Sequence, residues 1–123
     1  PALIAAAEVD HPGPTWIVGD LSELDLAAEW IVDGFDVIVS AGNVMAFLDP
    51  ATRREVLVRL HQHLRDGGRL VVGFGAGRDY EFAEFFADVE AAGLDIDHRL
   101  ATWELHPVQD DSEFLVAVLS ARR

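Results

Sequence analysis

The sequence predicts an α/β fold with a mostly parallel sheet that ends in an antiparallel hairpin. Two apolar runs rich in β-branched residues, 35–39 and 69–74, are typical of strands buried on both faces. A segment with helical spacing of its apolar residues follows each run. Two further runs, 95–105 and 113–121, close the chain, and the short polar loop between them (106–112) implies an antiparallel pair.

The first third of the chain gives weaker signals. Residues 1–9 predict a short helix with a proline near its start and an alanine-rich body, and the prolines and glycine of 11–14 end it. Residues 15–19 predict a short strand. From 22 to 34 the pattern is mixed and predicts at most a turn or two of helix.

Start and stop signals bound the two later helices. Asp49 followed by Pro50 is an N-cap with proline at the first helical position, and Gly67-Gly68 ends that helix. Asp79 can cap the next helix, which Gly93 ends. The apolar stripes of the two helices are expected in the core: Val56, Leu57, Leu60 and Leu64 in the first, and Phe82, Phe85, Phe86 and Val89 in the second.

Composition narrows the classes of function. At 123 residues, half of them apolar, the chain (1–123) is expected to form one domain with a real core. No apolar stretch approaches the length that spans a bilayer, and no basic-then-apolar leader opens the chain, so we expect a cytoplasmic protein without a membrane partner. The lack of cysteine excludes disulfides and thiolate metal sites. A net charge of −13 disfavours nucleic acid as a partner.

The candidate site lies where the run 35–39 ends. Small and polar residues, 40–43, follow this predicted strand at once, and ligands of open α/β sheets bind outside the carboxyl ends of the strands. We therefore expect 40–43 to form the floor of a ligand crevice. His61 and His63 stand two apart on a predicted helix and point in different directions, which argues against a shared metal, and no metal site is expected.

Three local features carry a resemblance to a known family. The first is 18–21, a strand that ends in an aspartate, and the second is the strand 35–40 running into 42–48. The third is 64–72, in which a helix leads through a double glycine into a strand. In this order and spacing, the features resemble the C-terminal two thirds of a class I S-adenosylmethionine-dependent methyltransferase, most closely those that act on small molecules.

The resemblance implies a Rossmann-like three-layer sandwich with a seven-stranded sheet, in which the strands of this chain stand third to seventh. We expect the chain to lack the first two strands and the glycine-rich loop that holds the methionine end of the cofactor, and to be inactive alone. S-adenosylmethionine is the implied cofactor, and a small molecule is the implied acceptor. Because the sulfonium is already activated, alignment of the acceptor with the methyl supplies most of the acceleration, and the sequence offers no convincing catalytic base.

The family's motifs assign a candidate cofactor site. Asp20 matches the aspartate that accepts a hydrogen bond from the adenine amino group, and the Leu21 amide matches the donor to the ring. Ser40, Ala41 and Gly42 match the strand tip under the methionine moiety, where small residues allow a close approach of the backbone.

Three further residues, Asn43, Met45 and Phe47, would face the acceptor. Two of these assignments have a structural alternative. Asp20 could instead cap the turn that follows it. Asn43 could instead be a turn residue that only supports left-handed backbone geometry.

A glycine cluster at 73–77 supports a rival interpretation as a nicotinamide-dinucleotide-binding oxidoreductase fragment. A strand, the cluster, a helix and an acid at Asp95 or Asp97 imitate a dinucleotide fingerprint. Arg78 stands where the fingerprint needs a glycine, and the residues after 77 are too few for two mononucleotide-binding halves. Binding of NADH rather than S-adenosylhomocysteine would favour this alternative.

A third interpretation is a noncatalytic α/β module that binds a partner. Without the first two strands of the resembled fold, one edge of the strand 35–39 would be unpaired, and an unpaired apolar edge is an association site. We therefore expect a homo-oligomer, or association through this edge, rather than a clean monomer.

Overall fold

The computed structural model describes residues 2–15, 17, 19–26 and 33–122. Its helices are α1 (Ala2–Asp10), α2 (Val44–Phe47), α3 (Arg53–Gln62) and α4 (Phe82–Ala91), with 3-10 turns η1 (Leu21–Glu23) and η3 (Pro50–Thr52). Its strands are β1 (Phe35–Ser40), β2 (Leu64–Gly75), β3 (Leu94–Leu100) and β4 (Phe114–Ala121).

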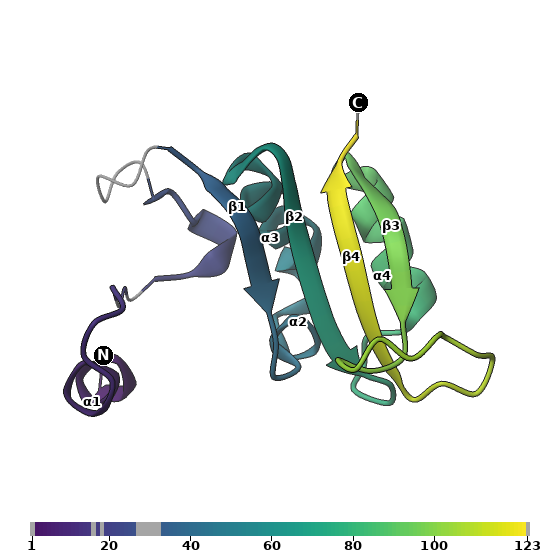
Figure 1. Ribbon diagram of the computed structural model, residues 1–123, viewed down its shortest axis with the longest axis horizontal. Helices are drawn as coiled ribbons and strands as arrows, with labels where there is room; N and C mark the ends of the chain where they lie inside the picture. Colours follow the sequence, from purple (N-terminus) through teal and green to yellow (C-terminus); the bar gives the residue numbers. More distant parts are fainter. Residues whose placement is uncertain (1, 16, 18, 27–32, 123) are drawn as a thin grey trace.

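In this part of the chain the four strands form one sheet in the order β1-β2-β4-β3 (Figure 1). β1 and β2 are parallel, with Ile38 opposite Leu70. β4 lies between β2 and β3 and is antiparallel to both, so that Leu119 is opposite Leu70 on one side and Ile96 on the other. Three of these strands therefore point the same way. The predicted α/β class, a Rossmann-like sheet that ends in an antiparallel hairpin, is confirmed.

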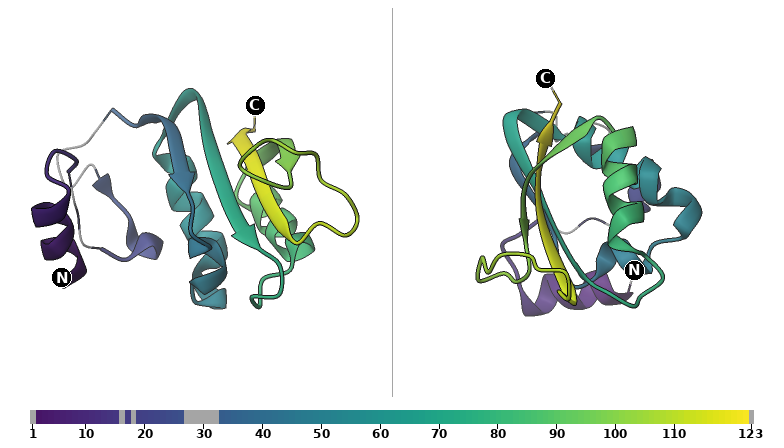
Figure 2. Two further views of the ribbon diagram at one scale, coloured as in Figure 1. Left: turned by 60° about the horizontal axis from the view of Figure 1, so that its bottom comes forward. Right: turned by 90° about the vertical axis from the view of Figure 1, so that its right-hand side faces the viewer.

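Helices α2, α3 and α4 cover one face of the sheet, and α1 stands apart from it (Figures 1 and 2). On the opposite face, Val37 and Val39 keep 57% and 58% of their surface exposed, so the prediction that this run is buried on both faces is wrong for β1. The described residues therefore form two of the three layers that the resemblance implied, because none of the helices described packs on this second face.

The strand expected at 15–19 is absent from the described residues of that range, Thr15, Ile17 and Gly19. Trp16 and Val18 lie outside the described residues. A strand needs a neighbour that satisfies its N–H and C=O groups, and no strand of the described sheet lies beside this segment. The expected helix before it is present as α1.

The helix expected from Asp49 begins as predicted and ends sooner. Oδ1 of Asp49 accepts the Ala51 N–H at 3.0 Å, which caps η3 just before α3. The double glycine does not end this helix, because β2 already begins at Leu64 rather than at Arg69. Leu64 pairs with Phe35, so the ladder with β1 determines where β2 starts.

Two other boundary predictions are wrong. Asp79 does not cap α4: its φ is 61°, in the left-handed region, and the helix begins three residues later. The strand expected up to 105 ends at Leu100, because the chain turns there and the Ala101 N–H donates to the His106 carbonyl at 2.7 Å.

The core lies between the sheet and the helices that cover it. Phe74 of β2 stands among the rings of Tyr80, Phe82 and Phe85, with centroids 5.4, 5.3 and 5.2 Å away. The predicted stripes divide into buried residues (Val56, Leu57, Leu60, Phe85 and Val89) and partly buried ones that pack against them (Leu64, Phe82 and Phe86). This packing holds the carboxyl ends of β1 and β2, where the candidate site was expected.

Candidate functional site

The tip of β1 is small and open. Ser40 is half-buried, whereas Ala41 and Gly42 are exposed. Gly42 has a φ of 70°, and a Cβ built there would meet no atom within 4 Å. The backbone at this tip is therefore accessible to a ligand, as the small residues of the sequence indicated.

Asn43 joins the tips of β1 and β2. Its φ of 63° is left-handed, and its Oδ1 accepts the Gly75 N–H at 2.7 Å. The structural role that the sequence left open for Asn43 is thus present. The same residue also lines the neighbouring cavity, so its predicted contact with an acceptor stays a prediction.

The one-turn helix α2 directs its side chains to two different sides. Met45 is 0% exposed and belongs to the core, so the prediction that it faces the acceptor is wrong in this structure. Helical geometry turns Met45 inward and leaves Phe47 outside, with 69% of its surface exposed. The Arg78 guanidinium lies 5.6 Å from the centroid of the Phe47 ring.

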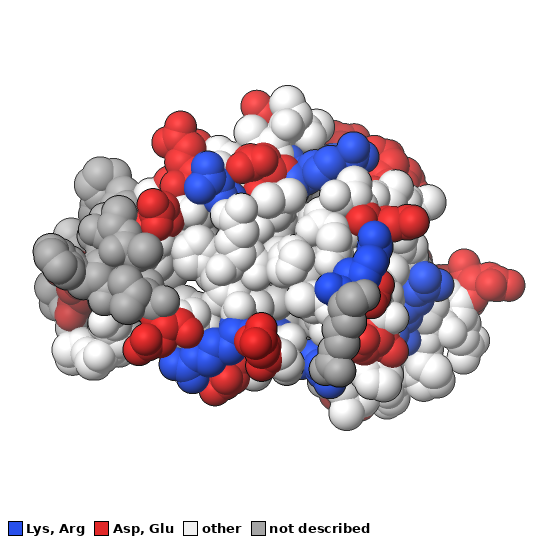
Figure 3. Space-filling model, turned by 90° about the horizontal axis from the view of Figure 1, so that it is seen from above, with Lys and Arg blue, Asp and Glu red and all other residues white. Residues whose placement is uncertain are grey.

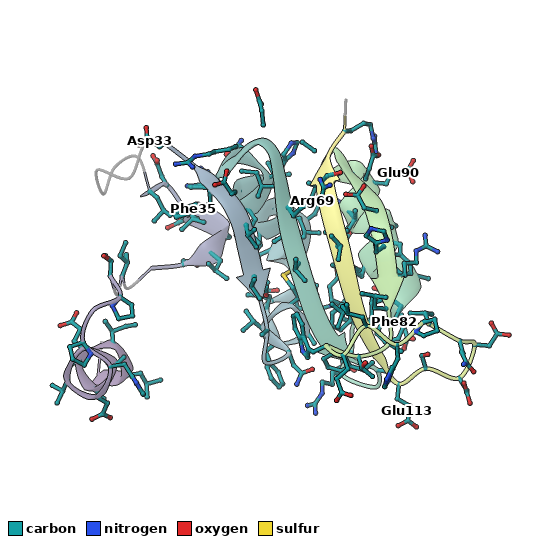
Figure 4. The ribbon with its side chains drawn as sticks, viewed as in Figure 1. Asp33, Phe35, Arg69, Phe82, Glu90 and Glu113 are labelled. Atoms are coloured by element: carbon teal, nitrogen blue, oxygen red, sulfur yellow. The ribbon has the colours of Figure 1, made fainter. Side chains whose placement is uncertain are left out.

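A cavity of about 670 Å³ opens beside these tips. Figure 4 places Glu113 at the end of the molecule where β1 and β2 terminate. Among the described residues Arg78 makes no ion pair, so its guanidinium can bind a ligand, and Glu113 contributes a carboxylate to the same cavity wall. The cavity is lined by Asn43, Gly75, Ala76, Gly77, Arg78, Glu113 and Phe114.

Arg53 holds the two tip loops together from inside the core. Its side chain donates to the Ala46 carbonyl at 3.0 Å and to the Asp79 carbonyl at 2.9 Å, and it lies 4.0 Å over the Tyr80 ring. Sequence reasoning missed this residue. Its spacing of three and four residues from Val56 and Leu57 places it on the apolar stripe of α3, which was the available signal.

Asp20 caps the turn η1. Its Oδ1 accepts hydrogen bonds from the Ser22 backbone N–H at 2.8 Å and from the Ser22 hydroxyl at 2.7 Å. These two bonds hold the pKa of Asp20 below its ordinary value of 3.8, and the bond from the Ser22 hydroxyl has the larger effect. The capping alternative is therefore present. Within the described residues only Oδ1 is engaged, so Oδ2 can still accept a hydrogen bond from a ligand.

The glycine cluster of the rival interpretation does not form a phosphate-binding loop. Gly73 lies within β2, and a Cβ built on it would collide with the Trp103 ring. The Gly75 N–H is already bonded to Asn43, and α4 begins only at Phe82. These contacts leave neither a free glycine loop nor an adjacent helix start for a pyrophosphate.

Within the described residues, no group of three or more His, Asp or Glu side chains could hold a metal ion. None of the helices described is long and apolar enough to cross a membrane. Seen from the side on which β1 and β2 begin, arginines lie beside acidic side chains (Figure 3). Two of the described ion pairs join Arg65 to Asp36 and Arg122 to Asp95, each at 3.2 Å.

A family model matches the part of the chain that carries these features. Residues 20–78 match the model described as CheR methyltransferase, SAM binding domain. The match runs from the capping Asp20 to Arg78 at the cavity wall, and so it contains the tips of both parallel strands.

A solved structure extends the likeness to nearly the whole chain. A TehB-like SAM-dependent methyltransferase from Corynebacterium glutamicum is 43% identical, with a TM-score of 0.89, over 99% of this chain. The chain is similar in fold and sequence to this S-adenosylmethionine-dependent methyltransferase. The two matches confirm the expected family resemblance and the expected cofactor. The chain spans 64% of the length of the Corynebacterium protein.

Two more distant methyltransferases share the fold. The CcbJ methyltransferase from Streptomyces caelestis has a TM-score of 0.79 and 16% identity, over 94% of this chain and 72% of its own. The glycopeptide N-methyltransferase MtfA, solved with S-adenosylmethionine, has a TM-score of 0.73 and 12% identity, over 98% and 72%. No curated protein matches the chain at a significant level.

Proposed function

We propose that the protein transfers a methyl group from S-adenosylmethionine to a small-molecule acceptor at the carboxyl ends of β1 and β2. The observation that carries this proposal is the open, glycine-containing tip of β1 beside a cavity of about 670 Å³. Pockets for small ligands have volumes of this order, roughly 300–1,000 Å³.

The cofactor contacts that we propose are those of the family's motif. The free Oδ2 of Asp20 accepts the adenine amino group, and the Leu21 amide donates to the ring. Ser40, Ala41 and Gly42 bring the backbone close to the methionine moiety, and the empty space around Gly42 supports this role.

The acceptor side is formed by Asn43, Phe47 and Arg78. Bound S-adenosylmethionine supplies an activated methyl group, so the chain's task is to orient the acceptor and to exclude water. The exposed Phe47 ring offers an apolar surface, and Arg78, which has no ion-pair partner in the described part of the chain, attracts a negative group on the acceptor. A net charge of −13 disfavours nucleic acid as the acceptor.

We also propose that the protein associates through the unpaired edge of β1. Within the described sheet β1 is an edge strand, and the exposed Val37 and Val39 lie on the uncovered face beside this edge. An apolar pocket of about 210 Å³ opens between β1 and Leu24 and Leu26. Light scattering tests this proposal, and a monodisperse particle of 13.5 kDa for the chain would contradict it. A single domain over 1–123 and a cytoplasmic location remain part of the proposal.

Calorimetric titration of S-adenosylhomocysteine tests the function. The full-length protein, meaning this chain together with the residues that we propose complete the fold, should bind it. Asp20→Ala should raise the dissociation constant about tenfold, the effect of one hydrogen bond to a charged group. Asp49→Ala is a matched control, because Asp49 caps η3 as Asp20 caps η1 but lies outside the proposed cofactor site.

Three outcomes of the titration are informative. Binding by the full-length protein alone supports the proposal and shows that chain outside 1–123 completes the site. Binding by residues 1–123 as well means that a second copy completes it. Binding by neither refutes the proposal and leaves a module with the fold alone.

A further inference from the structure

His63, the residue that follows α3, connects three separate parts of the chain. Its ring Nδ1 lies 2.6 Å from the Arg59 carbonyl of α3. Its ring Nε2 lies 3.0 Å from the Leu26 nitrogen. Its backbone carbonyl accepts the N–H of Phe35, the first residue of β1, at 2.8 Å.

The partners determine which ring nitrogen carries the proton. Leu26 contributes a backbone N–H, which can only donate, so Nε2 must present its lone pair. Arg59 contributes a carbonyl, which can only accept, so Nδ1 carries the hydrogen and donates it. The ring is thus a donor to the helix on one side and an acceptor from the segment 20–26 on the other.

The segment 20–26 is the one that carries the proposed adenine contacts. Asp20 fixes its beginning by capping η1. Leu21 and Leu24 pack partly buried against the core, and the bond from Leu26 to His63 fixes its end. The ring of His63 and Leu26 line the same small apolar pocket, where water competes poorly for the Leu26 N–H.

We propose that His63 is a positioning residue for cofactor binding, which holds the adenine-binding turn against α3 through the Leu26 N–H. This inference rests on the proposed function, because it gives Asp20 and Leu21 their role. It also means that α3 supports both parts of the proposed site, the strand tips and the adenine segment. Arg53, at the start of α3, holds the two tip loops, and His63, just after its end, holds the adenine segment.

Two amide substitutions separate the two bonds of the ring. The amide of Gln reaches the place of Nε2, so His63→Gln keeps an acceptor for Leu26 and loses the bond to Arg59. The amide of Asn reaches only the place of Nδ1, so His63→Asn keeps a donor to Arg59 and loses the bond to Leu26. The inference predicts that affinity for S-adenosylhomocysteine depends on the bond to Leu26 and not on the bond to Arg59.

The experiment is calorimetric titration of S-adenosylhomocysteine into the full-length protein and its variants. We expect His63→Asn to raise the dissociation constant about tenfold, and His63→Gln to stay within about threefold of the wild type. His61 is the matched control, because its Nδ1 also lies 3.0 Å from a carbonyl, that of Ala92, but away from the segment 20–26. His61→Asn should leave the dissociation constant unchanged.

Thermal melting of each variant reports folding separately. Should His63→Asn fail to fold, Leu26→Pro removes the same bond from the donor side and should also raise the dissociation constant. Equal dissociation constants for the wild type, His63→Asn and His63→Gln would overturn the inference, and so would an equal loss in both variants. Failure of the wild type to bind at all would refute the proposed function instead.

Discussion

Replacing Arg53 by methionine tests whether a buried cation holds the site together. The side chain is nearly inaccessible, with 4% of the residue exposed. Its two terminal nitrogens donate to the Asp79 and Ala46 carbonyls, and its Nε has no partner within the described residues. Methionine has a similar length and is apolar, so the substitution removes the charge and the bonds but leaves little empty space.

The size of the loss in stability depends on opposing contributions. Two hydrogen bonds from a charged donor contribute roughly 1.5–3 kcal/mol each, and the contact with the Tyr80 ring adds about 1 kcal/mol. Removal of the buried charge and of the unpaired Nε returns several kcal/mol. The carbonyl of exposed Asp79 can bind water, whereas that of buried Ala46 is left unpaired. We expect a net loss of about 2 kcal/mol in the free energy of unfolding.

Thermal and urea unfolding of the full-length protein measure this loss. For a domain of 123 residues, 2 kcal/mol corresponds to a fall in Tm of about 8 °C, and the fall is smaller for a longer protein. Arg54→Met is the matched control: the next side chain is 60% exposed and pairs with Asp88 at 3.0 Å, so its loss should cost less than about 1 kcal/mol. An Arg53→Met protein as stable as Arg54→Met, or more stable than the wild type, would show that Arg53 does not hold the loops.

Four further substitutions have expected outcomes. Asp20→Ala should weaken binding of S-adenosylhomocysteine without unfolding the protein. Because folding lowers the pKa of Asp20, the ionised carboxylate stabilises the fold above pH 3.8, and this stabilisation is lost as the pH falls below that value. A series of Tm measurements at decreasing pH should therefore show this loss in the wild type and not in Asp20→Ala. Gly42→Val and Gly67→Val should each cost roughly 1–2 kcal/mol, because both glycines have a positive φ, but calorimetry should show weaker binding for Gly42→Val alone. Tyr80→Phe removes a hydrogen bond of 2.6 Å to Asp88 and should cost about 1–2 kcal/mol. Burial raises the pKa of Tyr80 above its ordinary 10.0, so its contribution is present below pH 10 and lost as the pH rises, and urea unfolding at about pH 8 and pH 11 should show a smaller alkaline loss in the variant.

The elements that the sequence predicted well are those whose signals are local. The β-branched run of β1 ends at Ser40 in the structure, and Asp49-Pro50 starts a helix with the expected cap. The open tip at Gly42 could likewise be predicted, because small residues directly after a strand leave room for a ligand.

The features that could not be predicted depend on partners distant in the sequence. β2 begins at Leu64 because Phe35 of β1 pairs with it there. The sequence alone does not show this pairing, so the double glycine was interpreted as the end of the helix. Arg53 donates to carbonyls 7 and 26 residues away, so its chemistry exists only after folding. Met45 turns into the core because α2 is a single helical turn, whose phase the sequence did not reveal.

The position of β4 in the sheet has a consequence for the order in which the molecule assembles. Leu119 of β4 pairs with Leu70 on one side and with Ile96 on the other, so in the described sheet β4 is the one strand through which β3 joins the others. During synthesis β3 and α4 leave the ribosome first, yet β3 has no ladder to join until 114–121 follow. Until then the edge of β2 stays open to other chains, which makes the interval before β4 docks the time when the nascent protein is most prone to aggregate.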